Sequence, residues 1–346
     1  VCSSDLTESC AHIFCEIDDH PSQQVCRHLN NSRQPYYRGF FIMRKLLVLA
    51  IMALMLSSTA QAHFPEGQIF GAWQWPSNQL PNLDGDISEW EVLPAELWID
   101  IFQTEVAEGD IGREIDTANL NFRVALGWND ELDRVYYVYD RFDDNWDRDA
   151  GGFGCCGQDD SIEIFLDSDH SADRFAFWDG DYEDPEERAR NNGRANQTGH
   201  YRWPALEPFG FYWFWLSSST WHDKEPYSCC ADSFNLDGAH GTEANFQAEW
   251  YTVGWDDFDH NSPDNSIRHD FAEGEIIGIG IQVVDNDNGP SADDPRTAKW
   301  ALGGQPCING DGACGSDYIL LPIQADLLPT AVEGNSWGNI KASFGQ

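Results

Sequence analysis

The segment from Asp159 to Asp169, DDSIEIFLDSD, places the strongest constraint on what this chain can fold into. Ile162, Ile164 and Leu166 alternate in it with mostly polar residues, and this period of two is typical of a β-strand with one face in a core. Carboxylates bracket the strand at both ends, and their repulsion has to be offset by water, arginine or a cation. The sequence therefore predicts a buried strand whose acidic ends are either solvated or functional.

Further segments repeat this period of two, whereas no long stretch has a helical period. The clearest is Asn119–Trp128, which a polar turn separates from Arg134–Asp140, so the two segments predict a hairpin. Glu275–Val284 alternates in the same way. The other strand candidates are 70–75, 97–103, 200–203, 209–216, 246–252, 318–323 and 337–341. We predict an all-β fold: an antiparallel β-sandwich, jelly-roll-like, in a single domain.

The sequence predicts a secretory signal. Met43 opens MRKLLVLAIMALMLSSTAQA, where two basic residues precede an apolar run and the small-residue cleavage site Ala60-Gln61-Ala62. We interpret 1–42 as upstream sequence translated in frame, 43–62 as the signal peptide and 63–346 as the domain. No later segment is apolar enough to cross a membrane, so we expect a secreted protein, periplasmic or extracellular.

The formal net charge of the chain is −39. Residues 1–62 carry as many basic as acidic side chains, so the negative excess falls on 63–346. A surface this acidic repels nucleic acid and anionic lipid, and it suits calcium, cationic partners or neutral ligands. Most of these acids are expected to be ordinary solvated surface.

An even number of cysteines follows the expected cleavage site, and in a secreted chain this predicts disulfides. These cysteines are Cys155, Cys156, Cys229, Cys230, Cys307 and Cys314. The last two flank a Gly-rich turn and are expected to close a small loop, while the two adjacent pairs are expected to bridge each other. A zinc site is the rival interpretation, although adjacent cysteines rarely give tetrahedral geometry.

Acidic clusters in three places are candidate calcium sites. The VVDNDNG turn supplies alternate oxygens followed by Gly, which is how a short loop wraps a hard cation. Because calcium takes roughly six to eight oxygens, separate segments must converge on each site. The other two clusters are Asp140–Asp147, with Asp143 among its acids, and Asp159–Asp160. The predicted metal ligands are Asp140, Asp144, Asp159, Asp160, Asp285 and Asp287.

Four segments occur in the order found in family 9 carbohydrate-binding modules and their family 9-like relatives, and the chain resembles them over most of 83–302. LDGDISEW at 83–90 is similar to their opening motif, and 124–139 to their hairpin. DDSIEIFLDSD is similar to their central strand, and IIGIGIQVVDND at 276–287 to their late strand and acidic turn. The resemblance implies an antiparallel β-sandwich that binds structural calcium and, in many members, sugar, often beside xylanases and other glycoside hydrolases.

The two tryptophans that grip sugar ends in such modules have no counterpart here. Cys156-Gly157 and the Cys307–Cys314 loop stand in their places. Other aromatics near predicted loops could stack on sugar rings, although large aromatics are mostly buried. Glu163 matches a carboxylate of the family, and Arg202 is a looser match. The predicted ligand-binding residues are Glu163, Arg202, Trp146, Trp203 and Trp221.

We therefore expect a non-catalytic protein that recognises a poly- or oligosaccharide, alone or beside a glycoside hydrolase. No GxSxG or HExxH motif is present, and no catalytic residue is predicted. One alternative is a redox sandwich: His63, freed by cleavage, could bind copper with a second histidine, whereas haem would need two histidines because every methionine lies in the signal. The other is a structural envelope protein that has lost sugar binding.

Overall fold

The structure is a computed structural model. It describes residues 64–147, 159–172, 197–203, 211–213, 221–222, 224–229, 233–258, 262–287, 298–305 and 312–324, with backbone only for 197–203 and 211–213. All of them belong to one compact unit, Ala60–Gln346. Within this part of the chain, no helix is long and apolar enough to cross a membrane.

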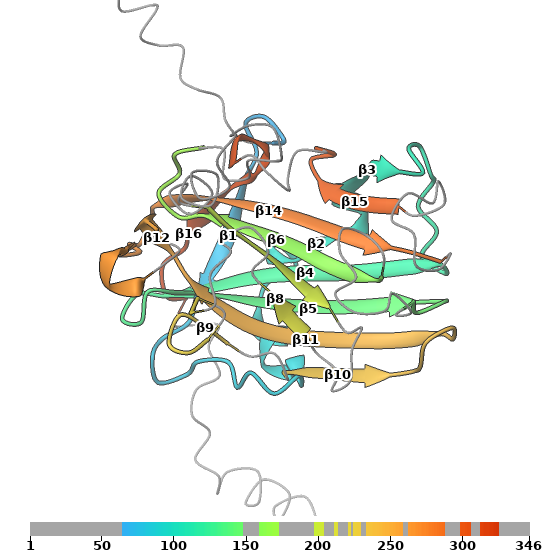
Figure 1. Cartoon of the computed structure of the whole chain (residues 1–346), viewed down its shortest axis with the longest axis horizontal. Coiled ribbons are helices and arrows are strands. Elements are labelled where there is room, and N and C mark those ends of the chain that lie inside the picture. Colours follow the sequence, from blue (N-terminus) through green and yellow to red (C-terminus); the bar gives the residue numbers. More distant parts are fainter. Residues whose placement is uncertain are drawn as a thin grey trace, which may run out of the picture. The chain divides into compact units, whose positions relative to one another are not determined.

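The strands form two halves of one curled sheet (Figure 1). One half contains β2 (Ile99–Asp100), β4 (Leu120–Asn129), β5 (Arg134–Asp143), β9 (Ser228–Cys229), β10 (Phe234–Asp237) and β11 (Ala244–Val253). The other contains β3 (Thr104–Gly109), β6 (Ser161–Asp167), β7 (Gln197–Trp203), β8 (Phe211–Trp213), β14 (Ile276–Asp285), β15 (Ala298–Leu302) and β16 (Ser316–Leu320). β12 (Trp255–Asp257) and β13 (Ile267–Arg268) form a separate hairpin.

β1 (Ile69–Gln74) joins the two halves. Its first part pairs with β16 and its last two residues pair with β4, both in parallel. Every other pairing in the described part of the chain is antiparallel. The prediction of a purely antiparallel sandwich is therefore wrong at β1, since a strand that reaches its partners through long connections is free to pair in parallel.

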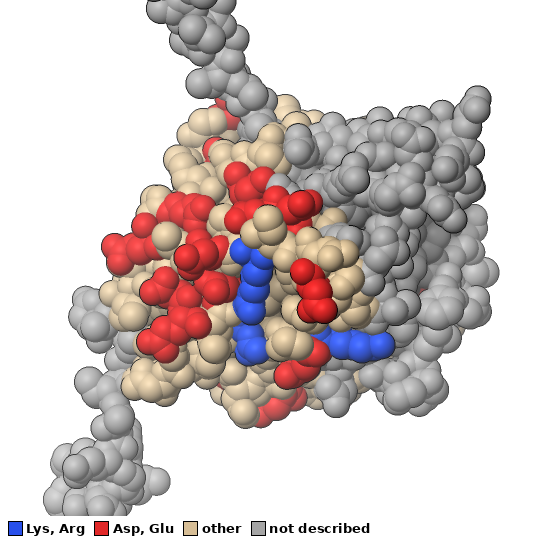
Figure 2. All heavy atoms as spheres, turned by 60° about the vertical axis from the view of Figure 1, so that its left-hand side comes forward, with Lys and Arg blue, Asp and Glu red and all other residues tan. Residues whose placement is uncertain are grey.

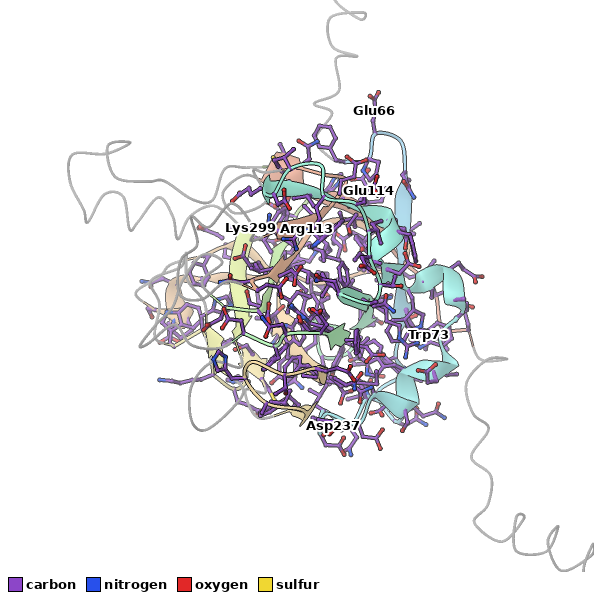
Figure 3. The ribbon with its side chains drawn as sticks, turned by 90° about the vertical axis from the view of Figure 1, so that its right-hand side faces the viewer. Glu66, Trp73, Arg113, Glu114, Asp237 and Lys299 are labelled. Carbon is purple, nitrogen blue, oxygen red and sulfur yellow. The ribbon has the colours of Figure 1, made fainter. Side chains whose placement is uncertain are left out.

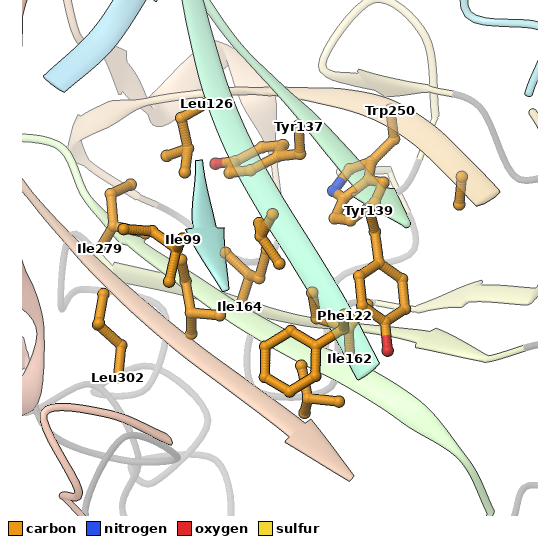
Figure 4. Packing of buried hydrophobic residues seen from close by; sticks show 14 of the residues in the cluster. Ile99, Phe122, Leu126, Tyr137, Tyr139, Ile162, Ile164, Trp250, Ile279 and Leu302 are labelled. Atoms are coloured by element: carbon orange, nitrogen blue, oxygen red, sulfur yellow. The ribbon is translucent and has the colours of Figure 1, made fainter. Parts of the chain in front are cut away.

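The main core lies between the two halves. The faces predicted for the hairpin and for the DDSIEIFLDSD strand are confirmed: Phe122, Leu126, Ile162 and Ile164 all point into this core (Figure 4). Tyr137 on β5 stacks on Trp250 of β11 with 5.3 Å between ring centroids. Alternation along each strand thus buries one face against the opposite half.

A second apolar cluster covers the outer face of β4, β5 and β11. It is formed by the segment that follows β1 and includes η1 (Ile87–Val92). Glu249 on β11 holds this segment in place: it accepts hydrogen bonds from Trp90 Nε1 (2.6 Å) and from the Gly85 amide (3.0 Å). Gly85 has φ +85° and a Cβ there would overlap the Phe234 backbone, so the turn needs glycine.

Some sequence predictions differ from the structure. Residues 97–103 form only the short β2 and then the 3-10 helix η3 (Ile101–Gln103), because Asp100 and Gln103 make a capping box. The polar strand β3 and its partner β15 were not predicted. Cys229 and Cys314 each take part in a disulfide. The other predicted disulfide cysteines, at 155, 156, 230 and 307, lie outside the described residues, and so does the strand candidate 337–341. The cysteine pairing stays a prediction. The remaining 3-10 helices are η2 (Ala95–Leu97), η4 (Pro263–Asn265) and η6 (Gly312–Cys314).

Candidate functional site

Three strand ends bring carboxylates together at one end of the two halves. Asp143 ends β5, Asp285 ends β14, and Asp160 immediately precedes β6. Because β6 runs antiparallel to β14, with Ser161 opposite Val284, Asp160 and Asp285 lie side by side. One carboxylate oxygen from each of the three lies within 4.8 Å of the others, and all three side chains are buried. We call Asp143, Asp160 and Asp285 the inner group.

Arg141 neutralises part of the inner group. Its Nε donates to Asp143 Oδ2 at 2.8 Å, and its Nη2 lies 2.7 Å from Asp160 Oδ1 and 3.7 Å from Asp285 Oδ1. Nη1 donates to the carbonyl of Val284 at 2.7 Å. A fully buried guanidinium is tolerated only when paired in this way. Arg141 therefore occupies the place of a counter-cation among these three acids.

A second set of acids, the outer group, lies next to the inner one. Oxygens of Asp143, Asp144 and Asp287 also lie within 4.8 Å of one another, and here Asp144 is exposed and Asp287 half-buried. Among the described residues, no Lys or Arg makes an ion pair with Asp144 or Asp287. The Oδ1 atoms of Asp287 and Asp285 are buried and accept no hydrogen bond from the described residues. Of the three acids of the outer group, only Asp143 therefore has an ion-pair partner in the described part of the chain, namely Arg141.

Burial is the main reason that these acids have raised pKa values. It raises the pKa of Asp285 to about 7, an effect that Arg141 opposes and Asp143 strengthens. The pKa of Asp287 is raised by burial and then by the charge of Asp143, and that of Asp144 by burial and then by Asp287. A bound cation would favour the ionised form of each acid and so relieve both effects.

The donor set fits a hard divalent cation such as calcium. The outer group offers oxygen atoms only, which is the ligand type that calcium prefers. Five carboxylates share this corner with two guanidiniums, those of Arg141 and of Arg113, whose Nη1 lies 2.7 Å from Asp285 Oδ2. Arg113 is labelled in Figure 3, which views the end of the sheet where the acids converge. The exposed Asp144 opens the outer group to solvent.

Four of the predicted metal ligands belong to these groups: Asp144, Asp160, Asp285 and Asp287. Asp140 does not, because alternation along β5 places it on the opposite face from Asp143. It pairs there with Arg123 Nε at 2.9 Å and accepts from Gln247 at 3.1 Å.

Asp159 is buried, so the solvated acidic strand end considered from the sequence is wrong for it, and it lies outside both groups. Asp143, which belongs to both groups, was left out of the predicted ligand set, and Arg141 was not considered. The alternation of β5 places both on the same face as Tyr137 and Tyr139, so the signal was present in the sequence.

The predicted sugar platform at Trp146 is not exposed. Only 1% of its surface is accessible, and its ring stacks on Phe246 at 5.2 Å. Its backbone bonds to Thr242 and Gly241, which tie the loop after β5 to the turn before β11. The expectation that a loop position leaves this tryptophan free is therefore wrong.

Trp221 is half-buried. It stacks on Phe258 with 5.2 Å between centroids and meets Tyr227 edge-on at 4.9 Å. The side chain of Trp203, the third predicted platform, lies outside the described residues. Its role stays a prediction.

Glu163 lies on the face of β6 that points away from the main core. It is 2% exposed, and its cross-strand neighbours in the register are Gln282 of β14 and Tyr201 of β7. Arg202 instead pairs with Ile162, and its side chain is outside the described part. The register therefore places Tyr201, rather than Arg202, beside Glu163. Gln282 is a polar neighbour that the sequence predictions did not include.

No family model matches the chain, and no curated protein matches it. Among solved structures, the chain is similar to a family 9 carbohydrate-binding module from Caldicellulosiruptor kristjanssonii in complex with cellotriose, with 12% identity, a TM-score of 0.43, and coverage of 76% of this chain and 98% of that one. The module from the same organism in complex with glucose gives 12% identity, a TM-score of 0.41, and coverage of 76% and 99%. The family that the sequence motifs resemble thus recurs among the solved structures that this chain is similar to.

Proposed function

We propose that this chain is a secreted, non-catalytic carbohydrate-binding protein whose fold is stabilised by calcium at the outer group. The observation that carries the proposal is the convergence of strands at the acidic corner. β5, β6 and β14 contain three of the four family-like segments, in whole or in part, and their ends supply Asp143, Asp160 and Asp285. Segments far apart in sequence therefore meet at the place where a cation would fix them together.

The calcium part rests on three carboxylates that share only one ion-pair partner, Arg141, among the described side chains. Asp143, Asp144 and Asp287 lie within reach of one ion, and the buried Asp287 Oδ1 accepts no hydrogen bond from the part of the chain that the structure describes. The sequence resemblance to modules that hold structural calcium points to the same ion. We propose that these three carboxylates are its ligands, with water and backbone carbonyls able to complete the shell.

The carbohydrate part rests on the family-like segments and on the polar outer face of β6 and β14. Glu163 and Gln282 are direct cross-strand neighbours there. Gly280 lies two residues before Gln282, and its missing side chain lets the Phe165 ring lie across the strand. Glu163, Gln282 and Phe165 are all buried. A carboxylate and an amide side by side are groups with which a protein can hydrogen-bond a sugar. A glycoside hydrolase encoded separately is the proposed functional partner.

The test is a fluorescence titration of the chain with cellotriose, glucose and a panel of soluble polysaccharides, first with calcium and then with chelator. We expect a saturable change with at least one glycan, and weaker binding after chelation. Glu163→Gln should weaken that binding, while Glu131→Gln on the exposed β4–β5 turn should not. Calorimetry with calcium alone tests the cation separately. A folded protein that binds calcium but none of the glycans would overturn the carbohydrate proposal and leave the cation proposal standing.

A further inference from the structure

Two arginines lie near each other at the opposite end of β5 from the acidic corner. Arg134 begins β5, and its guanidinium carbon lies 3.8 Å from the centre of the Tyr251 ring. Arg268 ends β13, and its Nη2 donates to the carbonyls of Leu132 and of Asp133, the latter at 2.8 Å. Arg268 thus reaches from the β12–β13 hairpin to the turn that leads directly into Arg134. Figure 2, in which the left-hand side of Figure 1 comes forward, shows Lys and Arg side chains lying among a larger number of acidic ones.

Neither guanidinium makes an ion pair in the described part of the chain, although the charge of Asp133 acts on Arg268. No described carboxylate lies within ion-pair distance of Arg134 or Arg268, although the chain has 59 acidic and only 20 basic residues. By contrast, each of the other arginines whose side chains the structure describes pairs with at least one carboxylate; these are Arg113, Arg123 and Arg141. Two unpaired arginines side by side are therefore an exception that composition does not favour.

Both arginines also have unused donors. The Nε atoms of Arg134 and Arg268 are buried and have no hydrogen-bond partner in the described part of the chain. The pKa of Arg268 is lowered mainly by burial; Asp133 opposes this effect and the charge of Arg134 adds to it. The two positive charges therefore repel each other in a partly dehydrated place, and an anion between them would relieve the repulsion.

Aromatic rings border this pair. Tyr251 and Tyr136 are buried beside Arg134, with 5.8 Å between their centroids. Tyr227 is half-buried, and it contacts Trp221, which is also half-buried. The ring faces provide an apolar border next to two forked donors, an arrangement that can hold a small ligand with a charged group and an apolar body.

We propose that Arg134 and Arg268 form a binding site for an oxyanion, carried as the carboxylate of an acidic saccharide or as a sulfate group. The guanidinium fork matches both groups, because two parallel N–H donors can meet two oxygens. The long-range field of an acidic protein repels anions, so recognition has to come from these short-range contacts. The site does not depend on sugar binding elsewhere, since a free anion would bind to it even if no neutral glycan bound the chain.

The experiment is calorimetric titration of the chain with sodium glucuronate, sodium sulfate and uncharged glucose at fixed ionic strength. We expect at least one of the two anions to bind. Arg134→Gln should raise its Kd by about tenfold or more, as the loss of a charge-assisted pair would. Arg123→Gln is the matched control, because Arg123 also lies over an aromatic ring, Trp98 at 4.2 Å, but is already paired with Glu91 and Asp140. It should leave the Kd unchanged.

Arg268 also holds the β4–β5 turn, so replacing it risks unfolding the protein. The second variant is therefore made at Arg134, as Arg134→Lys. Lysine keeps the charge and loses the fork, and we expect its Kd to lie between those of the wild type and Arg134→Gln. Binding of glucuronate alone would identify a carboxylate site, and binding of sulfate alone a sulfate site. Absence of binding by both anions, or equal loss in the Arg134→Gln and Arg123→Gln variants, would overturn the proposal.

Discussion

Arg141 Nη2 and Asp160 Oδ1 lie 2.7 Å apart, and their side chains are 0% and 1% exposed. Arg141 belongs to β5 in one half of the sheet, whereas Asp160 leads into β6 in the other. The pair therefore bridges the two halves at the end where the apolar core stops. An ion pair in such a place is costly to dehydrate, but it is far more costly to break.

Removing the positive partner should destabilise the protein strongly. Arg141→Met leaves Asp143 and Asp160 without an ion-pair partner among the described side chains, and it leaves Asp285 with Arg113 alone. We expect the free energy of unfolding, measured in urea without calcium, to fall by about 3–5 kcal/mol. The control is Arg123→Met, which removes partly exposed pairs and should cost about 1 kcal/mol or less. Equal losses in the two variants would show that the inner group does not depend on Arg141.

Two variants can test whether calcium binds to the outer group rather than to other acids of β5. Asp287→Asn should weaken calcium binding by about tenfold or more in calorimetry, because it removes one carboxylate from an oxygen-only site. Asp140→Asn should leave calcium binding unchanged, since Asp140 lies on the opposite face of β5 and pairs with Arg123. If the two variants behaved alike, the proposed ligand set would be wrong.

Glu249 should make stability depend on pH. Burial raises its pKa from 4.5 to about 7, against the opposing hydrogen bond from Trp90. The folded state therefore holds this proton more tightly than the unfolded state does, and the resulting stability is present below pH 4.5 and lost as the pH rises through about 7. Glu249→Gln should flatten the fall in unfolding free energy between pH 5 and pH 8, measured in urea. Glu131→Gln, an exposed control, should keep the wild-type slope.

His269 should add a loss of stability in a higher pH range. Burial lowers its pKa, but hydrogen bonds and charges from Asp256 and Glu275, with Nδ1 2.6 Å and Nε2 3.1 Å from their oxygens, outweigh it and raise the pKa above 6.5. The stability from this group is complete below pH 6.5 and is lost as the pH rises through the raised value. His269→Gln should therefore lose less stability than the wild type between pH 6 and pH 9. The exposed His240→Gln variant is the comparison, and a wild-type profile in both variants would contradict this role.

Alternation in the sequence was enough to predict most of the central strands and their inward faces. It predicted β4, β5, β6 and β14 and the burial of Ile162 and Leu126. A period of two shows which face of a strand is buried even when the neighbouring strands are not known. The candidate site, by contrast, depends on which strands and side chains lie next to one another in space. Alternation separates Asp140 from Asp143, but only the structure shows that the face of β5 carrying Asp143 meets the end of β14. Trp146 was misjudged because its burial depends on a contact with Phe246, a residue distant in the sequence.

β1 has a consequence for how this domain reaches its native state. Its first four residues pair with Asp317–Leu320 of β16, near the far end of the described chain, and its last two residues pair with β4. Neither half of the sheet has its full set of hydrogen bonds until β1 is in place, and β1 has to wait for β16 to be made. Such distant pairing slows folding, because the chain between the partners must be ordered first. On the ribosome the sheet would therefore remain incomplete until β16 has emerged, with the edges that await β1 exposed to other strands.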